Sequence, residues 1–146
     1  MNVKQISVEL RHVPGTLYEM TTVLADNGIS IRALTVANST DTSTVRLIVD
    51  NVIWASSVLM DAGFLPTFSD VIAVEVPNIP GGLNHVLAIL KDGNVNVEYM
   101  YHVGEKYSAF GGSICIIFKF TDNEHAAEVL SSSGVKMIEH KDLALM

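Results

Sequence analysis

The sequence predicts an α+β fold made of two copies of one β-α-β-β-α-β module. Two observations predict it: an internal repeat, and a strand–turn–helix junction that occurs once in each half. The repeat relates the halves by 66 positions, as from Ile6 to Ile72 and from Leu17 to Leu83. Later the offset grows to 71, as from Ala55 to Ala126, so the second copy holds 71 − 66 = 5 extra residues. Repeats at a fixed period indicate a repeated structural unit.

The repeat places one module at residues 1–70 and the other at residues 71–146. The extra residues fall around "HVGEKYSAFGG", in the region where the first copy has the shorter "ANSTDTS". Hairpin loops tolerate such insertions, and a glycine-rich stretch is poorly tethered. We therefore predict a mobile hairpin here that partly covers a ligand pocket, with Tyr107 and Phe110 packing over the ligand.

The first half reads as strand, helix, strand, strand, helix, strand. Ile6 and Val8 alternate with polar residues, which is typical of a half-buried strand. Leu17 and Leu24 lie on one helical face of "PGTLYEMTTVLADNG", and Gly28 follows where glycine commonly ends a helix. The remaining expected elements are strands through 29–33, 45–49 and 64–68, and a helix through 55–62 capped by Asp50 or Asn51 and closed by Gly63.

The second half repeats this order, with Thr121 and Glu124 expected to form a capping box before its second helix. Two right-handed crossovers then give a four-stranded antiparallel sheet with both helices on one face, the ferredoxin-like arrangement. A core of about 70 residues is marginal alone, and its sheet edges would be exposed. We therefore expect the two modules to pack side by side.

Composition excludes several classes of protein. The chain is 49% hydrophobic and carries a formal net charge of −7 over 146 residues. A basic face is needed to neutralise phosphates, so we expect no nucleic-acid partner and no binding to anionic membranes. The sequence shows neither a signal peptide nor an apolar run of 18 residues, so we expect a cytoplasmic protein.

Sequence motifs for catalysis, metals or cofactors are absent: there is no GxGxxG, Walker loop, HExxH or CxxC. The five histidines are scattered, and His125 has no second ligand one turn away. Cys115 stands in the apolar run "SICIIFKF", where a buried structural role is expected rather than that of a nucleophile. We therefore expect no enzyme activity, no metal and no cofactor.

The two junctions, "ELRHVPGTLYEMTTVLADNGISI" and "EVPNIPGGLNHVLAILKDGNVNV", each combine an apolar strand, a Pro-Gly turn and a helix. In this pattern the chain resembles the ACT domain family in its tandem form, over essentially its whole length. The resemblance implies a regulatory protein that binds a small ligand, often an amino acid, at the interface between two modules. It further implies that the first strand–helix loop of one module faces the second strand of its neighbour.

The same resemblance implies two ligand pockets. One would combine the loop of Asn78, Ile79, Pro80, Gly81, Gly82 and Leu83 with Ser30, and the other the loop of His12, Val13, Pro14, Gly15, Thr16 and Leu17 with Asn96. The residues themselves suit an amino acid. Backbone N–H groups at a helix start can bind its carboxylate, and asparagine side chains can both donate and accept hydrogen bonds. A local use of Pro-Gly in the turn is the alternative for the glycines, and a solvent-facing position is the alternative for Asn96.

Three functions remain in competition. The first is an amino-acid-binding regulatory protein without catalysis, acting as a homodimer or on a partner enzyme. The second is a constitutive interaction subunit of a metabolic enzyme, with vestigial pockets. The third, RNA binding on a ferredoxin-like sheet, is disfavoured by the negative charge and by the absence of the matching aromatic motif.

Overall fold

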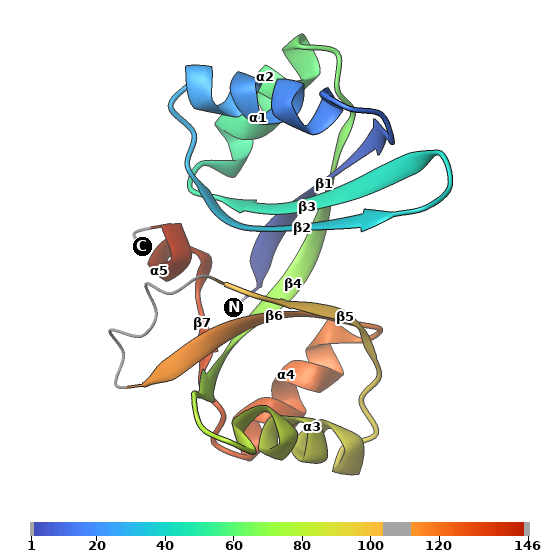
Figure 1. Cartoon of the computed structure of the whole chain (residues 1–146). Helices are drawn as coiled ribbons and strands as arrows, with labels where there is room; N and C mark the ends of the chain where they lie inside the picture. Colours follow the sequence, from blue (N-terminus) through green and yellow to red (C-terminus); the bar gives the residue numbers. More distant parts are fainter. Residues whose placement is uncertain (1, 104–111, 145–146) are drawn as a thin grey trace. The chain divides into compact units, whose positions relative to one another are not determined.

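The computed structural model describes residues 2–103 and 112–144 (Figure 1). The mobile hairpin that we predict over a ligand pocket, with Tyr107 and Phe110, lies outside the described residues. The described chain divides into two compact units. We call Lys4–Ser69 the first module, and Asp70–Ala144 together with Asn2 and Val3 the second module.

The first module contains β1 (Val3–Arg11), α1 (Thr16–Asp26), β2 (Ile31–Asn38), β3 (Thr42–Val49), α2 (Val52–Asp61) and the start of β4 (Pro66–Pro77). β3 runs antiparallel to both β1 and β2, and the strand order is β2-β3-β1-β4. Both helices cover the same face of this sheet (Figure 1).

The second module takes β4 as its first strand and adds α3 (Gly82–Asp92), β5 (Val97–His102), β6 (Ser113–Phe120), α4 (Asn123–Ser132) and β7 (Met137–Ile138). Its strand order is β7-β4-β6-β5, with antiparallel pairing throughout. α3 and α4 again share one face (Figure 1). This order confirms the predicted fold class of two ferredoxin-like modules with antiparallel sheets.

Two features of the element order were not predicted. The last strand of the first module and the first strand of the second are one strand, β4, and Phe64 precedes it instead of lying in it. A short helix, α5 (His140–Ala144), follows β7 and has no counterpart in the first module.

Each module has an apolar core of its own between its sheet and its helices. In the first module, Ile6 pairs with Leu47 and Val8 with Val45 across β1 and β3, and all four are fully buried. In the second, Phe118 and Phe120 stack with ring centroids 5.3 Å apart. Removing one such large side chain typically costs about 2–5 kcal/mol. The strand alternation seen in the sequence therefore marks the helix-covered face in each sheet.

The helix starts follow two different designs. α2 and α4 begin with side-chain caps: Asn51 accepts from the Trp54 N–H at 3.1 Å, and Asp122 accepts from the His125 N–H at 3.1 Å. The predicted cap at Asn51 is confirmed, and the predicted capping box at Thr121 is wrong by one residue. α1 and α3 begin instead at left-handed glycines with no side-chain cap.

None of the helices in the described part of the chain is both long enough and apolar enough to cross a membrane. Within residues 2–103 and 112–144, no cluster of His, Cys, Asp and Glu side chains could hold a metal ion.

Candidate ligand-binding loops

The loops before α1 and α3 have the same backbone design in both modules. Gly15 adopts φ of 95° and Gly81 adopts φ of 84°, a region that glycine enters without steric cost. The first turn of a helix leaves N–H groups without intrahelical partners, and no side chain caps either helix. These two helix starts therefore differ from those of α2 and α4, where the side chain of the N-cap residue accepts a hydrogen bond from an N–H group of the first turn.

Among the described residues, a backbone hydrogen bond links each of these loops to the connection between the second and third strands of its own module. The His12 N–H donates to the Asp41 carbonyl at 2.9 Å, and the Asn78 N–H donates to the Gly112 carbonyl at 2.7 Å. His12 and Asn78 occupy equivalent places two residues before the Pro-Gly pair. The backbones of the two loops are therefore anchored in the same way, and the loops differ in their side chains.

In the first module the anchor is extended by a polar chain. The Ser43 hydroxyl donates to Asn38 Oδ1 at 2.6 Å, and His12 Nδ1 lies 3.2 Å from the same hydroxyl oxygen. Because that hydroxyl already donates to an acceptor, its oxygen accepts from His12 Nδ1–H. Neutral His12 is therefore protonated on Nδ1, and its Nε2 is the acceptor.

The second module cannot build the same chain. Ile114 of β6 stands where Ser43 stands in β3, so this position of β6 offers no hydroxyl to Asn78. Ser43 and Asn38 were not among the predicted site residues. In the sequence, both belong to the polar run from Asn38 to Thr44, which we interpreted only as a loop between two strands.

The two glycines of the second loop have local reasons. Gly81 takes the left-handed conformation, and a Cβ on Gly82 would lie 2.1 Å from the Pro77 carbonyl oxygen. The Gly82 N–H donates to the Ile79 carbonyl at 3.0 Å, so it already has an acceptor. The expectation that Gly82 offers its N–H to a ligand therefore needs correction, and the remaining first-turn donors are those of Gly81, Leu83 and Asn84.

The rest of both loops lies at the surface. Val13 and Ile79, which are equivalent residues, are 45% and 65% exposed, and Leu17 is 38% exposed. Pro14, Gly15 and Pro80 are also exposed, while Thr16 and Leu83 are half-buried. Each loop thus presents one apolar side chain beside the start of an uncapped helix.

Ser30 and Asn96 each lie one residue before the second strand of their module, not within it as expected. The Ser30 N–H donates to Asp50 Oδ1 at 3.1 Å, and its carbonyl accepts from the Asp50 N–H at 3.2 Å. Asn96 Nδ2 donates to Thr121 Oγ1 at 3.2 Å. Both residues therefore serve a local contact between the second strand and the turn before the second helix.

Within a module, the structure does not bring the loop together with this residue. β1 and β2 are both antiparallel to β3, so the loop after β1 lies at the end of the sheet where β3 begins. Ser30 lies at the end where β3 finishes, beside Asp50. The same reasoning separates Asn78 from Asn96 in the second module.

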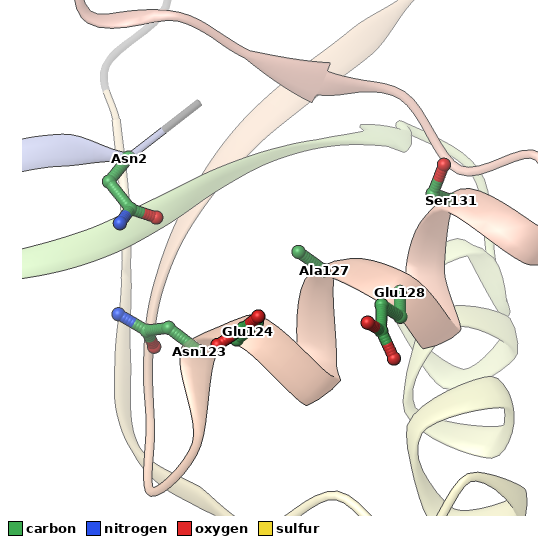
Figure 2. A pocket seen from close by; sticks show the side chains of 6 residues that line it. All are labelled: Asn2, Asn123, Glu124, Ala127, Glu128 and Ser131. Atoms are coloured by element: carbon green, nitrogen blue, oxygen red, sulfur yellow. The ribbon is translucent and has the colours of Figure 1, made fainter.

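Surface hollows occur elsewhere in the modules. Figure 2 shows one of about 490 Å³ along α4, lined by Asn2, Asn123, Glu124, Ala127, Glu128 and Ser131. Its two carboxylates would repel the carboxylate of an amino acid. None of the predicted loop residues lines this hollow, so we do not assign it to the ligand.

Cys115 is fully buried in β6, as predicted. Burial raises the pKa of its thiol to about 12, and the nearby Glu75 carboxylate adds to the effect. The thiolate is the nucleophilic form of cysteine, so this side chain is unreactive at neutral pH.

Comparison with known proteins agrees with these features. The chain matches the family described as ACT domain pair over residues 1–146, and it belongs to that family. It is 31% identical to a protein from Bacteroides thetaiotaomicron of known crystal structure, with a TM-score of 0.92, covering 100% of this chain and 98% of the other.

More distant structures share the fold. The regulatory subunit of aspartate kinase from Thermus thermophilus is 16% identical, with a TM-score of 0.65 and coverage of 90% of both chains. The corresponding subunit from Thermus flavus is 12% identical, with a TM-score of 0.61, covering 92% of this chain and 94% of the other. A comparison with curated protein sequences gives no match.

Proposed function

We propose that this protein is a regulatory protein that binds an amino acid or a similar small carboxylate and has no catalytic activity. The observation that carries the proposal is the repeated design of the two loops: in an ACT domain pair, α1 and α3 begin at left-handed glycines and lack side-chain caps, whereas α2 and α4 are capped. Uncapped helix starts offer N–H donors and a partial positive charge to a carboxylate.

The two ACT domains would correspond to residues 1–70 and 71–146. The proposed contacts are Asn78–Leu83 in the second module, where the Gly82 N–H is not among the donors, and His12–Leu17 in the first. Ser30 and Asn96 complete the prediction, and the placement of the ligand between two modules stays a prediction of the family resemblance. The fold shared with regulatory subunits of aspartate kinase supports a regulatory role. A homodimer or a partner enzyme would then sense the bound state.

The two loops would differ in their ligand contacts. Neutral His12 presents an Nε2 acceptor only in the tautomer with its proton on Nδ1, whereas the Asn78 amide can both donate and accept. We expect the loop of Asn78 to bind more tightly, because its contacts need no particular protonation state.

Calorimetric titration with each of the twenty amino acids tests the proposal. A micromolar ligand corresponds to about −8 kcal/mol. Asn78→Ala should weaken its binding at least tenfold. Asn2→Ala, which removes an exposed asparagine at the opposite end of β1 from His12, is the matched control and should bind as the wild type does.

Two results would contradict the proposal. One is the absence of binding by any amino acid at millimolar concentration, which would favour the constitutive interaction subunit. The other is full affinity in both Asn78→Ala and His12→Ala. Lost affinity in His12→Ala alone would reverse the ranking of the two loops.

A further inference from the structure

The outer surface of α2 is unusually apolar. Ile53, Trp54 and Met60 are 85%, 46% and 61% exposed, and Leu65 just beyond the helix is 83% exposed. Asp61 is the one charged residue of this helix. We call Ile53, Trp54, Met60 and Leu65 the α2 surface. Single exposed apolar residues are common, but several on one short helix mark an interaction site.

The second module provides an internal comparison. α4 occupies the same place in its module, and an offset of 71 residues aligns the two helices. The counterparts of Ile53, Trp54 and Met60 are Glu124, His125 and Ser131, which are polar and exposed. This position in the fold therefore does not require apolar side chains toward solvent.

We propose that the α2 surface binds a second copy of this chain, with the two α2 helices antiparallel around Ser56 and Ser57. In such a two-fold pair, Ile53 of one copy meets Met60 of the other, and the same contact recurs by symmetry. The two serines at the centre are small, so the helices can approach closely. The order apolar–small–apolar along the helix is thus self-complementary.

The charges of α2 fit the same arrangement. An antiparallel pairing places Asp61, at the end of one helix, near the start of the other at Val52. A carboxylate beside a helix N-terminus is stabilised by the helix dipole. The chain carries a net charge of −7, so copies repel each other least where charges are sparse, as on this helix.

The size of the surface suits a weak dimer. A fully exposed large side chain offers about 200 Å². The exposed fractions of the four side chains then give roughly 550 Å² per copy. A standard interface buries about 800 Å² per partner. If the pair covers all four side chains, they supply most of that area, and the serines with their neighbours supply more.

Sedimentation velocity over a concentration series tests the proposal on the full chain. We expect a reversible dimer, which Met60→Glu weakens at least tenfold. The matched control is Ser131→Glu, which adds the same charge at the equivalent position of α4 and should leave the dimer unchanged. Circular dichroism checks that both variants fold. Because Ile53 meets Met60 across the pair, Ile53→Glu should act as Met60→Glu does.

Cross-linking tests the geometry without adding a charge. Oxidised Ser57→Cys should form a disulfide-linked dimer because this position lies beside the proposed axis. Glu128→Cys, at the equivalent position of α4, should not. A chain that stays monomeric at all concentrations overturns the proposal. So does a dimer that persists in both glutamate variants, or one that Ser57→Cys fails to cross-link.

Discussion

Gly82 shows how a single residue can be explained by its own backbone surroundings. Its counterpart in the first module is Thr16, which does carry a Cβ and whose hydroxyl donates to the Arg11 carbonyl at 2.8 Å. Pro77 is the counterpart of Arg11, and its carbonyl oxygen lies where a Cβ on Gly82 would be. The second loop is therefore folded more tightly onto the end of its strand than the first.

We expect Gly82→Ala to lower the free energy of unfolding by about 2 kcal/mol or more, because the Pro77 carbonyl must move. Thr16→Ala should cost about 1 kcal/mol or less, since it removes one methyl group and a hydroxyl whose hydrogen bonds to the Arg11 and Val13 carbonyls lie near solvent. Urea unfolding of both variants measures the difference. Equal costs would show that the two loops are packed alike.

Cys115 gives a prediction on pH. Its pKa is about 12 in the folded protein and near 9 when exposed, so the unfolded state loses its proton first as the pH rises. The stability it contributes is therefore complete below about pH 9 and falls above it. Between pH 8 and pH 10 the loss should be about 1 kcal/mol in urea unfolding.

Cys115→Ala is the control for this loss, because lysines and tyrosines also titrate in that range. The variant is less stable overall, since it leaves a small cavity, but its stability should depend less on pH between 8 and 10. An identical pH dependence in the two proteins would show that the thiol is not the group responsible.

At the scale of the elements, the sequence offers two candidate N-caps for α4, Thr121 and Asp122, and the structure shows which one is used. Asp122 accepts from the His125 N–H, whereas Thr121 accepts from Asn96. Asp122→Ala should therefore destabilise the protein by about 1 kcal/mol. Calorimetric melting measures it, and Asn51→Ala at the start of α2 should give a similar loss. An Asp122→Ala variant as stable as the wild type would restore Thr121 as the cap.

Strand and helix positions were predictable because alternation and helical spacing are local properties of the sequence. The internal repeat supported these predictions, because each helix and strand pattern of the first module occurs again in the second. The continuity of β4 was not predictable, since a strand that ends one module and begins the next shows no break in its pattern. The partners of His12 were equally hidden: Ser43 lies 31 residues away, and only the pairing of β1 with β3 brings it close.

The end of α3 shows a similar limit. The first module ends its helix with Asp26-Asn27-Gly28, and the glycine takes the left-handed conformation. The second has Asp92-Gly93-Asn94, and here Asn94 takes that conformation at φ of 57°. Gly93 is needed because a Cβ there would lie 2.6 Å from a methyl group of Val129. The order Gly93-Asn94, the reverse of Asn27-Gly28, thus follows from packing against α4. The local sequence pattern does not reveal that packing.

At the scale of the whole molecule, the internal repeat predicted a fold of two similar modules, and the two Pro-Gly junctions carried the resemblance to the family. The residues that bind a ligand were inferred from the family resemblance and from helix-start chemistry. They remain a prediction, because each proposed pocket would draw its residues from both modules, and within one module the loop and Ser30 or Asn96 lie at opposite ends of the sheet. No local pattern can specify which surfaces of two folded modules act together.

A thermal-shift screen of the wild-type protein against the twenty amino acids tests the central claim most directly. A ligand that binds the folded state, present at about 100 times its dissociation constant, stabilises that state by about 2.7 kcal/mol. For a two-state chain of this size, the melting temperature should rise by roughly 5–10 °C. We predict such a rise for at least one amino acid, and a rise smaller by about half or more in Asn78→Ala at the same ligand concentration. A melting temperature that no amino acid changes, at concentrations up to tens of millimolar, would contradict the claim.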